Sequence, residues 1–146
     1  DEMIEAAVAA GCRVETGGAR ATDKGEGNFY QPTVLSGATA DMAIAREEIF
    51  GPVLPVVKVK DLDEAIAIAN ESDYGLTSSI FTNNINAALK AARQLQYGET
   101  YINREHFEAM QGFHAGRRNS GIGGADGKHG LMEYVETHVT YIQTHD

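Results

Sequence analysis

Two adjacent carboxylates, Glu47 and Glu48, precede an aromatic residue, Phe50, in a segment that passes through Gly51 and Pro52 into an apolar run. A carboxylate in such a loop can accept hydrogen bonds from two vicinal sugar hydroxyls, and the nearby aromatic can cover an apolar ring face. From the residue types alone, an ordinary exposed acidic loop is the favoured interpretation. A sugar-binding site is the alternative at this point.

Other residues that can do chemistry occur in less favourable patterns. The segment from Gly121 to Asp126 departs from the spacing of a nucleotide-binding glycine loop at its last position, and no helix is expected directly after it. Cys12, the single cysteine, has no activating base near it in the sequence and is typical of a buried, inert thiol. The histidines have spacings that match no familiar metal-ligand set: His106, His114, His129, His138 and His145. We therefore expect no metal site.

The composition indicates a strongly acidic globular protein. The chain has 146 residues, of which 42% are hydrophobic, and its 21 acidic and 12 basic side chains leave a net charge of -9. Because nucleic acids and anionic membranes attract basic surfaces, we expect neither as a partner. A single cysteine and the absence of an apolar run near the roughly 20 residues of a membrane span indicate a cytoplasmic location. The chain begins at Asp1, inside an expected helix, so we expect it to be a piece of a longer protein.

The first third of the chain contains a helix and two short strands. Apolar residues recur at helical spacing from Asp1 to Ala10, and a strand is expected from Cys12 to Thr16, followed by a glycine-rich loop. A second strand is expected from Tyr30 to Leu35. Pro32 places this strand at the edge of a sheet, or marks its start, because proline has no backbone proton for a sheet hydrogen bond.

The middle of the chain alternates regularly between strand and helix patterns. The expected elements are a strand over residues 53–59, a helix over 61–69 with a capping box, a strand over 76–81, a helix capped by Thr82 or Asn83, and a strand over 100–103. Apolar strands that alternate with helices of about ten residues are typical of a parallel sheet with helices on its faces. The sequence therefore predicts an α/β fold with a mostly parallel β-α-β-α-β sheet.

The last third carries a long glycine-rich loop from Arg104 to Gly130, and a loop of this length in a compact domain is usually functional. One or two helical turns are expected over Leu131 to Glu136. Residues 137–146 are expected as a terminal strand that pairs with its own sheet or with another subunit. We assign residues 1–136 to one domain and residues 137–146 to this terminal oligomerisation strand.

Five segments, taken in order, resemble the NAD(P)-dependent aldehyde dehydrogenase superfamily. The clearest is REEIFGPV, from Arg46 to Val53. The others are Phe29 to Leu35, Ala69 to Leu76 followed by Ser79 to Thr82, Gly98 to Asn103, and Asn119 to Gly123. The resemblance extends over essentially the whole chain. Within the superfamily, the segment from Asn103 to His114 is most similar to the bacterial enzymes that oxidise lactaldehyde or glycolaldehyde.

The resemblance implies an enzyme in which a cysteine attacks the aldehyde, hydride passes to NAD, and a glutamate-activated water releases the acid. In members of the family, the nucleophilic cysteine and this glutamate belong to segments upstream of the part that this chain resembles. We therefore expect no catalytic residue in this chain, and we expect the chain alone to be inactive. Its expected partners are the N-terminal part of the same enzyme and further copies in a homo-oligomer.

The resemblance also assigns roles to four residues. Glu48 matches the family position that hydrogen-bonds the nicotinamide ribose, and Phe50 matches the aromatic beside that ribose. Glu108 and His114 occupy positions where many relatives of broad specificity carry aromatics that line an apolar substrate tunnel. Unpaired buried polar groups penalise a plain alkyl aldehyde by about 1 to 3 kcal/mol each. We therefore expect the substrate to be a short 2-hydroxyaldehyde such as lactaldehyde or glycolaldehyde. The alternative is a non-catalytic folding or assembly module whose terminal strand pairs with another subunit.

Overall fold

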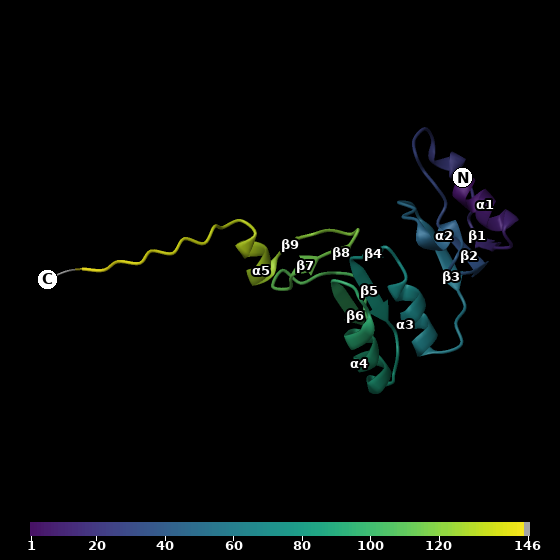
Figure 1. Ribbon diagram of the computed structural model, residues 1–146. Coiled ribbons are helices and arrows are strands. Elements are labelled where there is room, and N and C mark those ends of the chain that lie inside the picture. The colour runs from purple at the N-terminus through teal and green to yellow at the C-terminus, as the bar shows by residue number, and fades with distance from the viewer. Residues whose placement is uncertain (145–146) are drawn as a thin grey trace. The chain divides into compact units, whose positions relative to one another are not determined.

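The computed structural model describes residues 1–144, and the chain divides into two compact units, Asp1–Ile68 and Ala69–Asp146 (Figure 1). The first unit contains α1 (Glu2–Ala9), β1 (Arg13–Thr16), the short 3-10 helix η1 (Thr22–Lys24), β2 (Thr33–Ala38), α2 (Ala43–Arg46) and β3 (Val53–Val57). Helix α3 (Leu62–Asn70) begins in the first unit and ends in the second. The second unit continues with β4 (Tyr74–Gly75), β5 (Thr77–Ile80), α4 (Ile85–Gln94), β6 (Glu99–Ile102), β7 (His114–Ala115), β8 (Arg117–Arg118), β9 (Gly124–Ala125) and α5 (Gly127–Met132).

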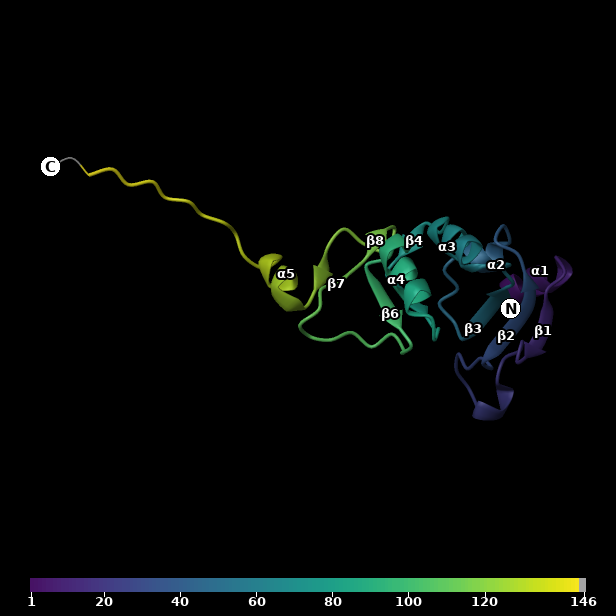
Figure 2. The same ribbon diagram turned by 90° about the horizontal axis from the view of Figure 1, so that it is seen from below.

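The sheet of the first unit has the order β1-β2-β3, and the three strands lie side by side in Figure 2. Strand β2 pairs antiparallel with β1 and parallel with β3. It begins at Thr33, three residues later than the predicted start at Tyr30, because the ladder can only begin after Pro32. Pro32 therefore lies directly before the strand, which agrees with the predicted alternative that it marks the strand's start. The other alternative, an edge strand, is wrong, because β2 is the central strand of the sheet.

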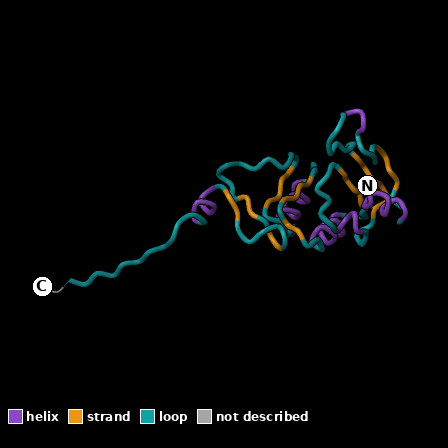
Figure 3. Tube along the Cα trace, turned by 90° about the horizontal axis from the view of Figure 1, so that it is seen from above, coloured by secondary structure: helices purple, strands orange, loops and turns teal. Residues whose placement is uncertain are grey.

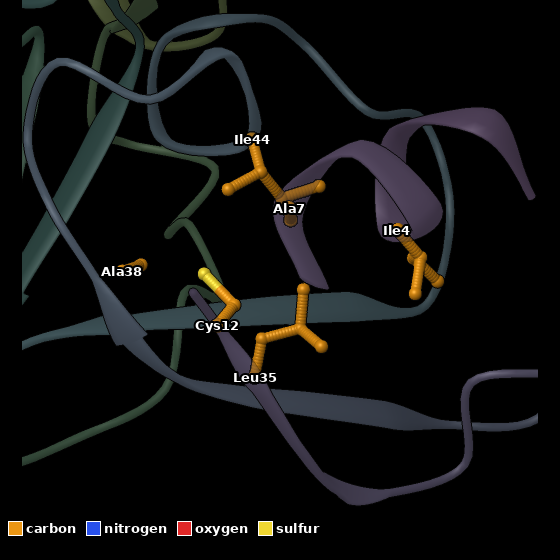
Figure 4. Packing of buried hydrophobic residues seen from close by; sticks show 6 residues of the cluster. All are labelled: Ile4, Ala7, Cys12, Leu35, Ala38 and Ile44. Carbon is orange, nitrogen blue, oxygen red and sulfur yellow. The ribbon is translucent and has the colours of Figure 1, made fainter. Parts of the chain in front are cut away.

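A small hydrophobic core forms between the sheet and the two short helices of the first unit. Leu35 of β2 is fully buried, and Ile4 and Ala7 of α1 and Ile44 of α2 pack with it (Figure 4). Cys12 lies in the same cluster, 5% exposed. The helical spacing of the apolar residues in α1 explains this arrangement, because Ile4 and Ala7 share one face of the helix.

The second unit is built on a parallel pair of strands, β5 and β6, joined by helix α4. Ala88 and Ala91 of α4 are 3% and 1% exposed, and the helix lies against β6. The predicted sequence of strand, helix and strand is present here. However, the prediction of one parallel sheet through all five elements is not confirmed, because β3 pairs with β2, whereas β5 pairs with β6.

The two longer helices begin with side-chain caps. At the start of α3, the backbone N–H of Glu64 donates to Asp61 Oδ1 at 2.9 Å, which is the first half of the predicted capping box. The returning bond differs, because Glu64 Oε2 accepts from the N–H of Lys60, one residue before the cap. At the start of α4, Asn84 Oδ1 accepts from the backbone N–H groups of Asn86 and Ala87. The predicted cap at Thr82 or Asn83 is therefore wrong by one or two residues.

Short antiparallel ladders order the glycine-rich segment. Strand β7 pairs with β9, and β8 pairs with β4. The following helix, α5, spans Gly127–Met132 instead of the predicted Leu131 to Glu136. It starts within the segment that the sequence indicated as a loop. The prediction missed this start because two glycines, Gly127 and Gly130, weaken the helical pattern of the sequence.

Residues 135–144 form neither helix nor strand and are drawn as loop in Figure 3. Val139, Tyr141 and Ile142 in this segment are 63%, 93% and 83% exposed. Residues 137–144 of the expected strand over 137–146 therefore make no strand pairing within the described part of the chain, and its last two residues lie outside that part. Its pairing with another subunit remains a prediction.

Candidate active site

Glu48 and Phe50 lie in the loop that connects α2 to β3. The loop is held at its far end, where the backbone N–H of Thr33 donates to the carbonyl of Pro52 at 2.8 Å. Between the two residues, Ile49 turns inward and packs against the core of the first unit. The loop therefore has a partly buried anchor, Ile49, between two exposed side chains.

The exposure of these two side chains is compatible with a cofactor contact. Phe50 is 91% exposed and has a positive φ of 50°, an uncommon backbone conformation for an aromatic residue. Glu48 is exposed, and none of its described contacts within residues 1–144 is a hydrogen bond or an ion pair. An unpaired carboxylate and an uncovered ring fit a ribose, whose hydroxyls donate hydrogen bonds and whose ring carbons are apolar.

In the second unit, the candidate residues lie near a polar face of the β5–β6 pair. The register places Thr77 opposite Glu99 and Ser79 opposite Tyr101. Since alternate residues of a strand point to the same side, these four side chains share one face of the pair. Helix α4 packs against β6 and has buried alanines. The unit therefore combines an apolar helix contact with a polar strand face.

His114, at the start of β7, is bound to this polar face. Its Nδ1 lies 2.9 Å from Glu99 Oε2, and the same oxygen accepts the hydroxyl of Tyr101 at 3.0 Å. The side chains of His114 and Glu99 are 31% and 16% exposed. Strand β7 can approach so closely because Gly98 and Gly124 lack side chains, since a Cβ at either position would meet the backbone of Ala115 or His114 within 2.5 Å.

Glu108 is exposed, and the hydrogen bonds and ion pairs described for residues 1–144 include none between it and His114. Both residues interact with the group around Tyr101: Glu108 through its charge, and His114 through Glu99, which also binds the Tyr101 hydroxyl. Partial burial, the hydrogen bond to Glu99 and the negative charges of Glu99 and Glu108 raise the pKa of the Tyr101 hydroxyl, against a smaller opposing effect of Arg104. The charge of Glu108 therefore acts on the same group of side chains that holds His114.

His106 attaches the loop that carries Glu108 to the polar face. Its two ring nitrogens lie 2.9 Å from Thr77 Oγ1 and 2.5 Å from Ser79 Oγ, and its ring stacks on Tyr101 with centroids 5.3 Å apart. His106 is thus held on three sides. This explains how a segment without regular structure has a defined position over the strands.

The sequence analysis missed Glu99, Tyr101 and His106 as members of the site. The two strand residues are separated by one position, which is the spacing of a shared strand face, so this signal was present in the sequence. The contact of His106 depends on how the chain turns after β6. Asn103 makes that turn with a φ of 56° while its side chain bonds both backbone groups of Thr82, an arrangement that no local pattern reveals.

Other chemistry has little support in the described residues. No cluster of histidine, cysteine or acidic side chains within residues 1–144 could hold a metal ion, and His145 lies outside that part. Cys12 is buried, and its thiol contacts Met42 Sδ at 3.5 Å. Within the same residues, no helix is both long enough and apolar enough to span a bilayer.

The segments that suggested a family contact one another in the second unit. Ser120 Oγ accepts from the N–H of Gly75 at 2.9 Å, and the N–H of Gly98 donates to the carbonyl of Gly75 at 3.0 Å. The sequence profile that describes the aldehyde dehydrogenase family matches residues 1–140 of this chain. The chain therefore belongs to the aldehyde dehydrogenase family.

Within this family, the chain is similar to several enzymes of known name. The chain is 58% identical to lactaldehyde dehydrogenase of Escherichia coli K12 over 144 residues, which cover 99% of this chain and 30% of the relative. A crystal structure of lactaldehyde dehydrogenase from E. coli matches with a TM-score of 0.92 and 59% identity over 98% of this chain and 30% of that one. Betaine aldehyde dehydrogenase from Staphylococcus aureus, solved in complex with NAD+, matches with a TM-score of 0.85 and 37% identity over 91% of this chain and 28% of that one. The chain thus spans about 30% of the length of these relatives.

Proposed function

We propose that this chain is the C-terminal part of an NAD-dependent enzyme that oxidises a short 2-hydroxyaldehyde, such as lactaldehyde or glycolaldehyde, to the acid. We refer to the longer protein as the full-length protein. The observation that carries the proposal is the pair of polar residues, Glu108 and His114, on a chain that is 58% identical to a lactaldehyde dehydrogenase. The partly buried His114 is held by Glu99, so it presents a hydrogen-bonding group and not an apolar wall.

The choice of substrate follows from hydrogen-bonding energetics. Glu108 and His114 can bind a hydroxyl next to the aldehyde carbon. A plain alkyl aldehyde of the same size leaves these groups unpaired, which costs about 1 to 3 kcal/mol for each group. The full-length protein should therefore prefer lactaldehyde to propanal, which differs from it by one hydroxyl.

The cofactor role falls on the first unit. Glu48 would accept hydrogen bonds from the nicotinamide ribose, and Phe50 would cover its carbon face. NAD, when bound, supplies the acceptor for the hydride of the aldehyde. The exposed carboxylate of Glu48 and the 91% exposed ring of Phe50 support this assignment, as does the NAD+ complex of the S. aureus relative.

The covalent step belongs to residues outside this chain. In our proposal, a cysteine of the full-length protein forms the thiohemiacetal, because Cys12 is 5% exposed and packs in the core of the first unit. This chain then contributes cofactor and substrate contacts but no nucleophile. A cytoplasmic location is part of the proposal, supported by a single cysteine that is free and buried.

Steady-state kinetics of the full-length protein test the substrate assignment. Replacing Glu108 and His114 together by phenylalanine should reduce the ratio of kcat/KM for lactaldehyde to that for propanal by about 10-fold or more. The Glu105→Gln variant changes a neighbouring carboxylate that is 78% exposed and serves as the control. Unchanged discrimination against propanal in the double variant would refute the assignment.

A second candidate function is assembly. The exposed apolar residues Val139, Tyr141 and Ile142 favour it, because such side chains in an extended segment are typical of a strand that pairs with another chain. Native mass spectrometry tests this function directly. Multiples of 15.7 kDa that disappear in a Tyr141→Asp, Ile142→Asp variant would support self-association through the segment. Oligomers that survive these changes would exclude it.

A further inference from the structure

The carboxylate of Glu99 has two partners on a single oxygen. Glu99 Oε2 lies 2.9 Å from His114 Nδ1 and accepts the hydroxyl of Tyr101 at 3.0 Å. With 16% of its side chain exposed, Glu99 is the least exposed member of the pair with His114. Its position between a tyrosine on its own strand and a histidine on another element leaves the carboxylate little freedom to turn.

The position of Glu99 is determined by the strand pair beneath it. Glu99 and Tyr101 share one face of β6 and lie opposite Thr77 and Ser79 of β5. His106 bonds both of these hydroxyl residues and stacks on the Tyr101 ring, so the tyrosine is itself held. The Tyr101 hydroxyl therefore donates to Glu99 from a defined direction.

A carboxylate that accepts at Nδ1 determines where the imidazole carries its proton. An ionised carboxylate has only acceptors, so the ring nitrogen that faces it must carry hydrogen. In the neutral imidazole, the other nitrogen, Nε2, is then an acceptor. No hydrogen bond described for residues 1–144 occupies His114 Nε2, so this nitrogen is available to a ligand.

We propose that Glu99 is a positioning residue that holds His114 as the Nδ1–H tautomer, so that Nε2 accepts the hydrogen bond of the substrate hydroxyl, with Tyr101 fixing the carboxylate. The identity of the substrate rests on the proposed function, whereas the tautomer does not. Glu99 acts through His114 and does not touch the substrate. Specificity for a hydroxyaldehyde then depends on Glu99 and Tyr101, which lie behind His114, as well as on the residues that face the substrate.

A merely structural role for Glu99 makes different predictions. If Glu99 only tied β7 to β6, its loss would loosen the site and lower kcat/KM for every aldehyde. If Glu99 sets the tautomer, its loss penalises only substrates that donate a hydroxyl to His114. The Glu99→Gln variant keeps the size of the side chain but adds donors, so it no longer requires a proton on Nδ1.

A double-mutant cycle in the full-length protein separates these roles. We expect Glu99→Gln to lower the ratio of kcat/KM for lactaldehyde to that for propanal by about 10-fold, through KM more than kcat, with propanal kinetics nearly unchanged. In a His114→Phe background, the same change should have no further effect on the ratio. Glu105→Gln is the matched control. Equal losses for both substrates, or an equal effect of Glu99→Gln without His114, would overturn the proposal.

A second measurement is independent of any substrate. Solid-state 15N spectra of the histidine-labelled full-length protein, with the His114 signals identified by their loss in His114→Phe, report which ring nitrogen carries hydrogen. We expect a protonated Nδ1 and a bare Nε2 near pH 8, and a shift toward the opposite tautomer in Glu99→Gln. A protonated Nε2 and a bare Nδ1 in the unmodified protein would refute the proposal even if lactaldehyde is the substrate. If Glu99→Gln does not fold, Tyr101→Phe tests the same arrangement, and it should weaken the preference for Nδ1–H.

If the full-length protein does not prefer lactaldehyde to propanal, the proposed function fails. The tautomer measurement still decides the role of Glu99 in that case. The two proposals can therefore be refuted separately.

Discussion

Gly98 lies where the start of β6 approaches the backbone of β7, and alanine at this position should distort the candidate site. An added Cβ would lie 1.6 Å from the carbonyl oxygen of Ala115 and 3.1 Å from that of Leu76, whereas ordinary contacts lie at 3.4 Å or more. Since both neighbours are backbone atoms, no side chain can rotate to make room. The β7 backbone must move by nearly 2 Å relative to β6.

The cost of this movement follows from the bonds it strains. The N–H groups of Gly98 and Glu99 donate to Gly75 and Leu76 at 3.0 and 3.1 Å, so the start of β6 is not free to retreat. Leaving a backbone group without its partner costs about 1 to 3 kcal/mol. With the steric strain added, we expect a loss of roughly 3 kcal/mol or more in the free energy of unfolding. Because Ala115 follows His114, the contact between His114 and Glu99 should open as well.

Urea denaturation and substrate kinetics of the full-length protein measure both effects of Gly98→Ala. We expect a lower urea midpoint and a reduced ratio of kcat/KM for lactaldehyde to that for propanal. The matched stability control is Gly51→Ala, because its φ lies outside the left-handed region and the nearest neighbour of its Cβ would be at 3.8 Å. If Gly98→Ala unfolds at the same urea concentration as Gly51→Ala and keeps the substrate preference, the reasoning about close backbone approach is wrong.

Three further changes test other parts of the structure. Glu48→Gln in the full-length protein should raise the KM for NAD by about 10-fold or more, because a charged acceptor is replaced by a neutral one, and an unchanged KM would argue against a ribose contact. Asn70→Asp should lower the free energy of unfolding by about 1 to 3 kcal/mol in urea denaturation, because Asn70 Nδ2 donates to the carbonyl of Gln94 at 2.8 Å and a carboxylate oxygen there would face another acceptor. The pKa of Tyr101 is raised, so its folded state holds the proton more tightly. The resulting contribution to stability is complete below pH of about 10 and is lost as the pH rises through the folded pKa. Difference titration at ultraviolet wavelengths against Tyr101→Phe should show this late ionisation, and Glu99→Gln should lower the pKa of Tyr101 toward its ordinary value.

Local patterns predicted the longer helices and strands, but not the short elements η1, α2, β4, β7, β8 and β9. The apolar spacing of α1, the Asp61 cap of α3 and the β-α-β order around α4 all depend on neighbours in the sequence, and each is present in the structure. Two boundary errors have local causes. Strand β2 starts after Pro32, which has no N–H for a ladder hydrogen bond, and the glycines of α5 weaken the helical pattern at its start.

The candidate site was less predictable than the fold. The roles of Glu48, Phe50, Glu108 and His114 are predictions that come from the family resemblance. The contact of His114 with Glu99 joins residues 15 positions apart, and it exists only because β7 approaches β6 at Gly98. Pairings of this kind depend on how short ladders meet in space, which hydrophobic periodicity does not encode.

The attachment of His106 has a consequence for how substrate choice can change. Because this side chain is bound to β5 and stacked on β6, the loop is tethered at its beginning, and β7 holds it again at His114. The intervening stretch, Phe107–Phe113, is held between these two points and also at its middle, where the carbonyl of Met110 accepts from the N–H of Gly127 at 2.9 Å. If Glu108 and His114 bind the substrate as proposed, side-chain exchanges in this stretch that keep the Met110 carbonyl in place are the natural target for directed evolution of new aldehyde preferences in the full-length protein.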